Sequence, residues 1–322
     1  DALSYAFAED LSLNEITSLE MNTSVYGAEY KARRGYWGLF DYYELEAHKA
    51  KQKLRRFGLI GKEIAAQPAL YLKDNQRPLI LAGEASIRGD ALLPEAGIRP
   101  GSISGRGYAG SALVYGIMQQ SQKSLPKIDK PRESYLNRLI QGNIGGDSES
   151  LVLRPGLTVK RSFEDPTLLV KGHILELREL ELSGNLILWA ADRIVVDASA
   201  QLNDVILVAP RIEIKDWVKG RFQAIATQQI QVGKKSQLTY PSALWVQSSS
   251  SQISEQLEAM IYMDSYSLVH GTIGTFLSND SNKYRPQIKI DEHASVLGEV
   301  ICSGNLELKG NVNGSVSTSG FL

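Results

Sequence analysis

Cysteine is nearly absent from this 322-residue chain, in which Cys302 is the single example. One cysteine excludes an intramolecular disulfide and any metal site built from several thiolates. Long apolar runs are also missing, since no stretch approaches the roughly 20 residues that span a bilayer as a helix. The formal net charge is −1, so no overall field would attract nucleic acid. We therefore expect no nucleic-acid partner, and the four histidines are too scattered to predict a metal site.

What remains is the composition of a folded protein, with 43% hydrophobic and 22% charged residues. A chain of this length can bury one large core or two ordinary ones. It begins at Asp1 without an initiator methionine and stops at Leu322 within a strand-like pattern, so we expect both ends to be trimmed. A signal peptide, a membrane anchor or an arbitrary cut would each account for the start.

Residues 1–76 are predicted to form an N-terminal helical region that caps the rest of the chain. The clearest expected helix runs from Tyr43 to Phe57, where acidic residues come first and basic residues last. That order complements the helix dipole. Gly58 follows in the position of a helix C-cap.

An aromatic cluster lies at the start of this segment, and Trp37, Tyr42 and Tyr43 are its candidate ligand or partner surface. Aromatic side chains bury large apolar areas and also contact ligands through their rings. The alternative is that the cluster seals the N-terminal region against a core. The sequence leaves both roles open.

Strand-like alternation of apolar and polar residues begins near Leu79 and predicts a parallel β-solenoid over residues 77–322. A partly helical insertion is expected at about 117–150. Within it, the helical segments are predicted around Met118–Ser121 and Ser134–Ile140, next to two prolines.

An internal repeat is the main support for this fold. Ile194, Ile212 and Ile230 follow one another at eighteen-residue steps, and a second column two residues later repeats the spacing. Such constant steps indicate coils stacked so that like residues lie above like. The predicted fold class is mainly β, a single-stranded parallel β-helix with coils of about 18 residues.

One glycine recurs in the repeat, in the frame Ile-x-Ile, then Val-x-Gly-x-Val. Glycine at such a position predicts a tight corner or a close backbone approach. Leucine at Gly220 would overpack the core at a cost of about 1–3 kcal/mol, whereas Gly314 near the chain end is expected to tolerate it better. The structural glycines predicted from this frame are Gly89, Gly220, Gly271, Gly298 and Gly314.

With this frame, and above all with Gly304-Asn-Leu-Glu-Leu-Lys-Gly-Asn-Val-Asn-Gly-Ser-Val316, the chain resembles the bactofilins. The match is good over about 285–320 and looser over about 174–320. The resemblance implies a right-handed parallel β-helix and self-association, or assembly with other envelope proteins. It carries no catalytic residues.

The whole chain also resembles uncharacterised, membrane-anchored β-helix proteins of bacteria. This resemblance implies an extracytoplasmic location, periplasmic or on the cell surface. The contact with the membrane would be made through an N-terminal segment that is absent from this chain.

The sequence lacks the residue patterns of the enzymes that share a solenoid fold, and the full pattern of a dinucleotide-binding site. A left-handed acyltransferase solenoid needs a uniform six-residue sub-period, which the frame lacks, and no two acids stack in the eighteen-residue columns as a lyase or hydrolase would require. Gly105–Gly110 matches a dinucleotide-binding pattern without the surrounding strand–helix–strand unit. We therefore predict no catalytic, cofactor-binding or metal-binding residues.

Two functional classes follow. The first is a non-enzymatic structural or assembly protein of the bacterial cell envelope. The second is an extracytoplasmic glycan- or peptide-binding module, with a carbohydrate-active β-helix enzyme as a further alternative.

Overall fold

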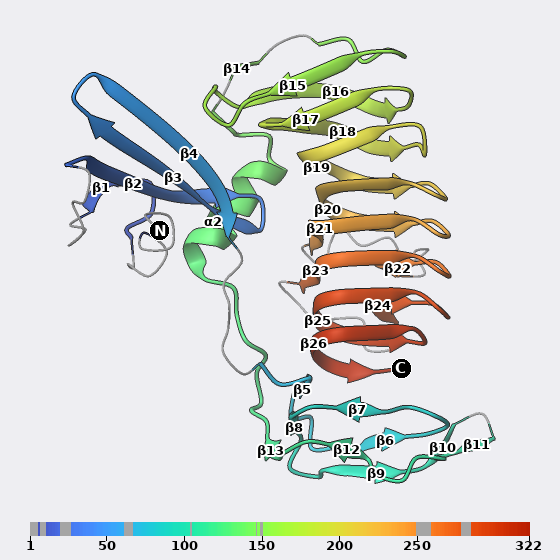
Figure 1. Ribbon diagram of the computed structural model, residues 1–322. Coiled ribbons are helices and arrows are strands. Elements are labelled where there is room, and N and C mark those ends of the chain that lie inside the picture. Colours follow the sequence, from blue (N-terminus) through green and yellow to red (C-terminus); the bar gives the residue numbers. More distant parts are fainter. Residues whose placement is uncertain are drawn as a thin grey trace.

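The computed structural model describes residues 11–19, 27–60, 67–103, 105–145, 147–148, 151–248, 259–277 and 285–322, together with Ala6. These residues are mainly β, and α2 (Lys130–Ile140) is a helix of eleven residues. Figure 1 shows a tall stack of strands, an antiparallel sheet beside it, and a block of short strands below its C-terminal end.

The stack is built from parallel strands in register, because aliphatic residues at constant spacing face inward on every strand. Ile194 pairs with Ile212, and Ile212 pairs with Ile230, so the predicted inward column is confirmed. Its strands are β14 (Asp147–Ser148), β15 (Thr158–Arg161), β16 (Leu168–Leu177), β17 (Glu181–Gly184), β18 (Leu186–Val196), β19 (Gln201–Ile214), β20 (Lys219–Val232), β21 (Gln237–Ser248), β22 (Ile261–Met263), β23 (Leu268–Leu277), β24 (Pro286–Ile290), β25 (Ser295–Leu308) and β26 (Asn311–Phe321).

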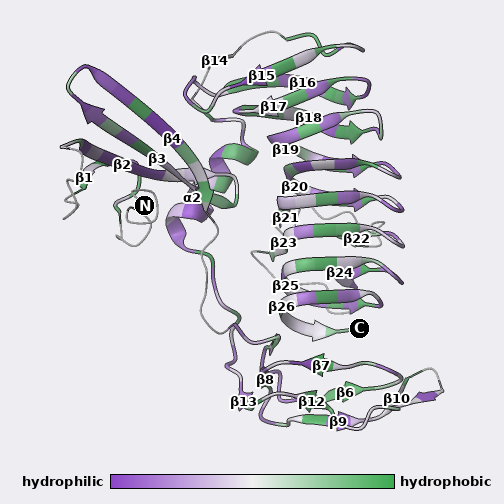
Figure 2. Cartoon of the chain, in the orientation of Figure 1, coloured by the Kyte–Doolittle hydropathy of each residue, from purple (hydrophilic) through white to green (hydrophobic). Residues whose placement is uncertain are grey.

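The same column continues through Ile261, Ile288 and Leu306, all fully buried. Figure 2 shows the consequence, with hydrophobic stretches recurring at similar places along successive strands of the stack. Long strands such as β20 and β25 bend and pair with different neighbours along their length. Six strands, β20, β21, β23, β25, β24 and β22, are thereby bonded into a closed ring, and the other strands lie outside it.

Three of the predicted glycines form a column at one corner of the stack. Gly271 pairs with Gly298, and Gly298 pairs with Gly314. Their φ angles of 146°, 139° and 147° lie where side-chain-bearing residues are rare. A Cβ on any of the three would overlap a backbone carbonyl oxygen of the adjacent strand. The predicted close backbone approach is therefore confirmed, and Gly89, with a φ of 116°, has the same left-handed character.

Gly220 does not belong to this column, so its alignment with the other glycines was wrong. It pairs with Leu202 and Leu238, and Leu238 pairs with Val269, which precedes Gly271 by two residues. The step from Ile212 to Gly220 is eight residues, as is the step from Ile261 to Val269, whereas the sequence alignment assumed a shorter turn.

Residues 67–121 form a block that continues the stack beyond β26. Within it, Leu70 pairs with Val316 of β26 on one side and with Ala91 on the other. Leu79 and Leu81 share the core of residues 261–316, as the repeat predicted. The strands of this end block are β5 (Leu70–Leu72), β6 (Leu79–Leu81), β7 (Ile87–Arg88), β8 (Ala91–Leu93), β9 (Ile98–Pro100), β10 (Ser102–Ile103), β11 (Arg106–Gly107), β12 (Val114–Tyr115) and β13 (Met118–Gln120).

The N-terminal region is an antiparallel sheet, so the predicted helix over Tyr43–Phe57 was wrong. Burial alternates over Tyr43–Glu46, and the acids and bases of the segment lie on facing strands, with Glu46 opposite Arg55. Cross-strand ion pairing accounts for the charge order that suggested a helix dipole. The sheet runs in the order β1 (Ile16–Leu19), β2 (Glu29–Trp37), β3 (Phe40–Lys49) and β4 (Gln52–Ile60).

Helix α2 confirms the helical segment expected after Pro131. Asp129 caps its N-terminus by accepting a bond from the Arg132 backbone N–H at 2.8 Å. The other helical expectation was wrong, because Met118–Gln120 is the strand β13 and pairs with Ala91–Leu93. Figure 1 shows the chain climbing from the end block to α2, which lies between the N-terminal sheet and the stack.

Candidate ligand-binding cleft

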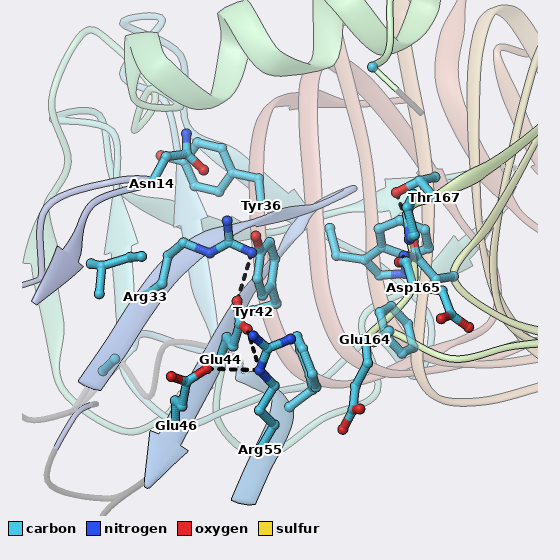
Figure 3. Close-up of a pocket in the computed structure, with 18 of the residues that line it drawn as sticks. Asn14, Arg33, Tyr36, Tyr42, Glu44, Glu46, Arg55, Glu164, Asp165 and Thr167 are labelled. Carbon is cyan, nitrogen blue, oxygen red and sulfur yellow. Dashed lines mark hydrogen bonds and ion pairs between the residues drawn. The ribbon is translucent and has the colours of Figure 1, made fainter. Parts of the chain in front are cut away.

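A cleft of about 730 Å³ lies where the N-terminal sheet, helix α2 and the first strands of the stack meet. This volume is typical of small-molecule and peptide sites. One wall is the face of β2, β3 and β4 that is turned towards the stack. The other wall is the loop 163–167, which precedes β16. Figure 3 shows Glu164, Asp165 and Thr167 across the gap from Arg33 and Arg55.

The base of the cleft is formed by the docked tip of the β2–β3 hairpin. Trp37 is 5% exposed, donates from Nε1 to the Asp204 carbonyl oxygen at 3.2 Å, and meets the Phe163 ring edge-on at 5.2 Å. Trp37 thus joins the sheet to the stack while one part of its ring lines the cleft.

Gln223 holds the same hairpin tip from the stack. Its amide Nε2 donates to the Trp37 carbonyl oxygen at 2.8 Å, and its Oε1 accepts from the Leu39 backbone N–H at 2.7 Å. Gln223 is buried, so both backbone groups of the turn are satisfied away from water. Gly38 between them has a φ of 61°, and a Cβ there would overlap the Gln223 amide.

Arg132 fastens helix α2 to the hairpin. Its guanidinium donates to Asp41 Oδ1 at 2.6 Å and to the Leu39 carbonyl oxygen at 2.7 Å. It also lies over the Tyr36 ring, 4.4 Å from the centroid. One ion pair, one hydrogen bond to a backbone carbonyl and one cation–π contact from a single side chain give this joint a defined geometry.

The sheet wall carries a network of opposite charges. Arg33 bonds Glu44 at 2.7 Å, while Lys53 and Arg55 bond Glu46 at 2.6 and 2.8 Å. The hydrogen bond from Lys53, followed by that from His48, lowers the pKa of Glu46 to about 2. Glu46 is therefore ionised at neutral pH, and both carboxylates already have basic partners on the sheet. The Nε of Arg33 is buried and has no hydrogen-bond partner among the described residues.

Three tyrosines line the cleft as neutral groups. Burial raises the pKa of Tyr135 to about 12, and burial is also the main cause of the raised pKa of Tyr36 and Tyr42. Gly35 lies opposite Tyr42 on the neighbouring strand, where a Cβ would overlap the Tyr42 ring. The glycine therefore makes room for that ring to lie along the sheet wall.

The loop wall is braced from the stack and presents carboxylates. Asn185 is buried, accepts from Thr167 Oγ1 at 2.9 Å, and donates to the Asp165 carbonyl oxygen at 2.8 Å. The side chains of Glu164 and Asp165 are exposed. In the described part of the chain, neither carboxylate takes part in a hydrogen bond or ion pair.

The predicted aromatic surface is therefore divided. Trp37 and Tyr42 line the cleft, whereas Tyr43 is 4% exposed and packs in a separate core on the opposite face of the sheet. Sequence analysis missed Arg33 and Glu164. A two-residue period through Tyr42, Glu44 and Glu46 was the available signal for the sheet wall, but the helical interpretation concealed it.

The described ranges contain no metal-binding cluster, and the one thiol group in them is buried. No three His, Cys, Asp or Glu side chains gather there in a way that would hold a metal ion. Cys302 is fully buried, and burial raises the pKa of its thiol to about 11. None of the described helices has the length and apolarity to cross a bilayer.

No family model, no curated protein and no solved structure matches this chain.

Proposed function

We propose that this chain is a non-enzymatic structural protein of the bacterial cell envelope, in which a parallel β-helix carries a ligand-binding cleft on its flank. The eighteen-residue register of β18, β19 and β20 supports a single-stranded β-helix with one coil per repeat. The bactofilin resemblance adds the right-handed sense. A stack of buried aliphatic columns is a rigid support.

The observation that carries the proposal is the way the cleft is held. Its parts are distant in the sequence, yet each is bonded to the stack. Gln223 holds the hairpin, Asn185 braces the loop wall, and Trp189 Nε1 donates to the Ile140 carbonyl oxygen at the end of α2 at 3.0 Å. A site fixed on a rigid element keeps its geometry without a ligand.

The envelope assignment rests on the resemblance to membrane-anchored β-helix proteins. Protease treatment of intact cells and of spheroplasts that produce the full-length, C-terminally tagged protein tests it. We expect the tag to be digested while the cytoplasmic membrane is intact. Digestion only after that membrane is lysed would overturn the location.

A second candidate function is assembly with copies of itself, and the outer edge of β13 favours it. Among the described strands, β13 pairs with β8 alone. Ile117, just before β13, and Met118, its first residue, are 62% and 57% exposed. Unpaired strand edges are templates for further strands. Sedimentation velocity should give larger species with rising concentration, and Met118→Lys should suppress them. A concentration-independent monomer would contradict this role.

A further inference from the structure

We propose that the cleft binds a peptide segment that carries a cationic and an anionic group on either side of an apolar side chain. The inference rests on the binding role proposed for the cleft and names the class of ligand. It follows from which charges in the cleft are compensated and which are left open.

The charges on the sheet wall largely compensate each other. Glu44 and Glu46 are engaged by Arg33, Lys53 and Arg55. The cationic group that is left open at the cleft is the guanidinium of Arg138, which helix α2 contributes to the lining. Arg138 is exposed at the cleft and forms no ion pair within the described ranges. An anionic group of a ligand would be received here.

The opposite wall has the opposite sign. Glu164 and Asp165 face the cleft without cationic partners in the described part of the chain. Residues of both walls line one cleft, and Figure 3 shows Glu164 across the gap from Arg55, so one ligand can contact both walls. A cationic group would be received by the two carboxylates.

The base between the walls is apolar. Trp37, Phe163 and Ile187 line it, and Tyr42 and Phe57 extend it along the sheet wall. Such a surface removes an apolar side chain from water, while the charged groups on either side set its orientation. A short peptide segment supplies all three features at adjacent positions along one chain.

A glycan fits this cleft less well. A neutral glycan would cover the Arg138 guanidinium and the Glu164 carboxylate without giving either an opposite charge, and uncompensated charges are costly to remove from water. An acidic glycan would meet repulsion from Glu164 and Asp165. The mixed charge of the walls therefore favours a peptide.

A selection from a displayed random-peptide library, with the intact chain immobilised, tests the proposal alongside a panel of neutral and acidic glycans. We expect the selected peptides to combine a basic and an acidic residue around an apolar one. In binding assays, Glu164→Lys and Arg138→Glu should each weaken such a peptide about tenfold or more, the equivalent of about 1.4 kcal/mol. A peptide with its basic residue changed to an acidic one should bind Glu164→Lys better than the unsubstituted protein.

Matched controls lie in the end block, where Glu95 and Arg106 are exposed and remote from the cleft. Glu95→Lys and Arg106→Glu make the same charge changes and should leave affinity unaltered. Equal thermal stability of all four variants would exclude unfolding as the cause of any loss. Selected peptides without paired charges, or affinities unaffected by the cleft substitutions, would overturn the peptide assignment.

The glycan panel separates the two levels of the proposal. A glycan whose binding is weakened by Glu164→Lys or Arg138→Glu would overturn the peptide class and keep the binding role of the cleft. Absence of any ligand, peptide or glycan, that responds to these substitutions would overturn the binding role itself.

Discussion

At the scale of single residues, the corner glycines show how closely the coils approach one another. Gly298 has a φ of 139°, and the Gly271 carbonyl oxygen occupies the space that its Cβ would need. The conformation and the lack of space act together, because neither a change of side-chain rotamer nor a small shift of one neighbour relieves both. Backbone contact between coils thus requires glycine at this corner.

Gly298→Ala is expected to destabilise the fold by about 2–4 kcal/mol, from left-handed strain and backbone overlap together. Gly220→Ala should change the free energy of unfolding by about 1 kcal/mol or less, because its added Cβ would lie 3.0 Å from the Phe222 ring at an ordinary φ. Urea denaturation of both variants measures the difference.

The same reasoning changes which of two glycines should be more sensitive to substitution. From the sequence we expected a larger loss of stability at Gly220 than at Gly314, and the structure predicts the opposite. Gly314 has a φ of 147°, and a Cβ there would overlap the Gly298 carbonyl oxygen. A smaller loss of stability in Gly314→Ala than in Gly220→Ala would refute this account.

Cys302 offers a second measurement at this scale. The thiol is fully buried and donates to the Asn305 carbonyl oxygen at 3.2 Å, and its pKa is raised to about 11. Because the thiolate is the reactive form, iodoacetamide at pH 8 should leave the native protein unmodified and label it fully in urea. As the chain has one cysteine, the mass change is unambiguous. Rapid labelling of the native protein would contradict the burial.

At the scale of elements, the hairpin β2–β3 is held mainly through its tip. Gln223 satisfies one backbone donor and one backbone acceptor of that tip, and Arg132 satisfies another acceptor. A buried backbone group that loses its partner costs about 1–3 kcal/mol. The position of the N-terminal sheet therefore depends on few side chains.

Gln223→Leu keeps the approximate volume of the side chain and removes both bonds to the tip. We expect it to destabilise the docked hairpin by about 2–4 kcal/mol, since two buried backbone groups are left unpaired. Hydrogen exchange at Trp37–Leu39 should accelerate, while that of β19 and β20 should change little. Gln223→Glu, which keeps the acceptor for the Leu39 N–H, should be intermediate. Unchanged exchange in Gln223→Leu would show that other contacts hold the tip.

Glu46 makes the stability of the β3–β4 hairpin depend on acid pH. Its pKa is lowered from 4.5 to about 2 in the folded chain, so the folded state binds this proton less readily than the unfolded state. The contribution is present above about pH 4.5 and is lost as the pH falls towards 2. Between these values the unsubstituted protein should lose more stability than Glu46→Gln. Parallel pH profiles of the two proteins would contradict the assignment.

At the scale of the whole molecule, the end block covers the C-terminal edge of the stack. Its first strand lies against β26, across a separation of more than 200 residues, and Gln67 adds bonds to Glu299 and Ser315 at 2.8 and 2.9 Å. The cover shields the edge of β26 from pairing with other chains. At this end of the described stack, the outermost strand is therefore β13 rather than β26.

Leu70→Asp should detach the end block, because Leu70 is 4% exposed between Val316 and Ala91 and an unpaired charge there is costly. Limited proteolysis should then cleave within 67–121 before it cleaves β18–β21. Leu92→Asp, on the partly exposed side of the adjacent strand, is the control and should remain resistant. Simultaneous loss of both regions in Leu70→Asp would mean that block and stack unfold as one unit.

The inward columns were predictable because parallel, in-register stacking places each residue beside its counterpart one repeat away. Residues that are one repeat apart in the sequence therefore have their side chains on the same side of the stack. The N-terminal strands were not predictable in the same way. In Tyr43–Phe57 the acids and bases satisfied a helix dipole as well as a strand pair, and only the facing of Glu46 and Arg55 decides between them.

By itself, the sequence determined the aliphatic columns, the mainly β architecture, the special positions of Gly89, Gly271, Gly298 and Gly314, and the helix that follows Asp129. Each of these follows from a local spacing or a local conformational preference. Tertiary structure alone decided that residues 67–121 cover β26, and that the hairpin tip meets Gln223 to complete the cleft. Every strand edge offers the same backbone donors and acceptors, so the choice of partner depends on how side chains far apart in the sequence fit together.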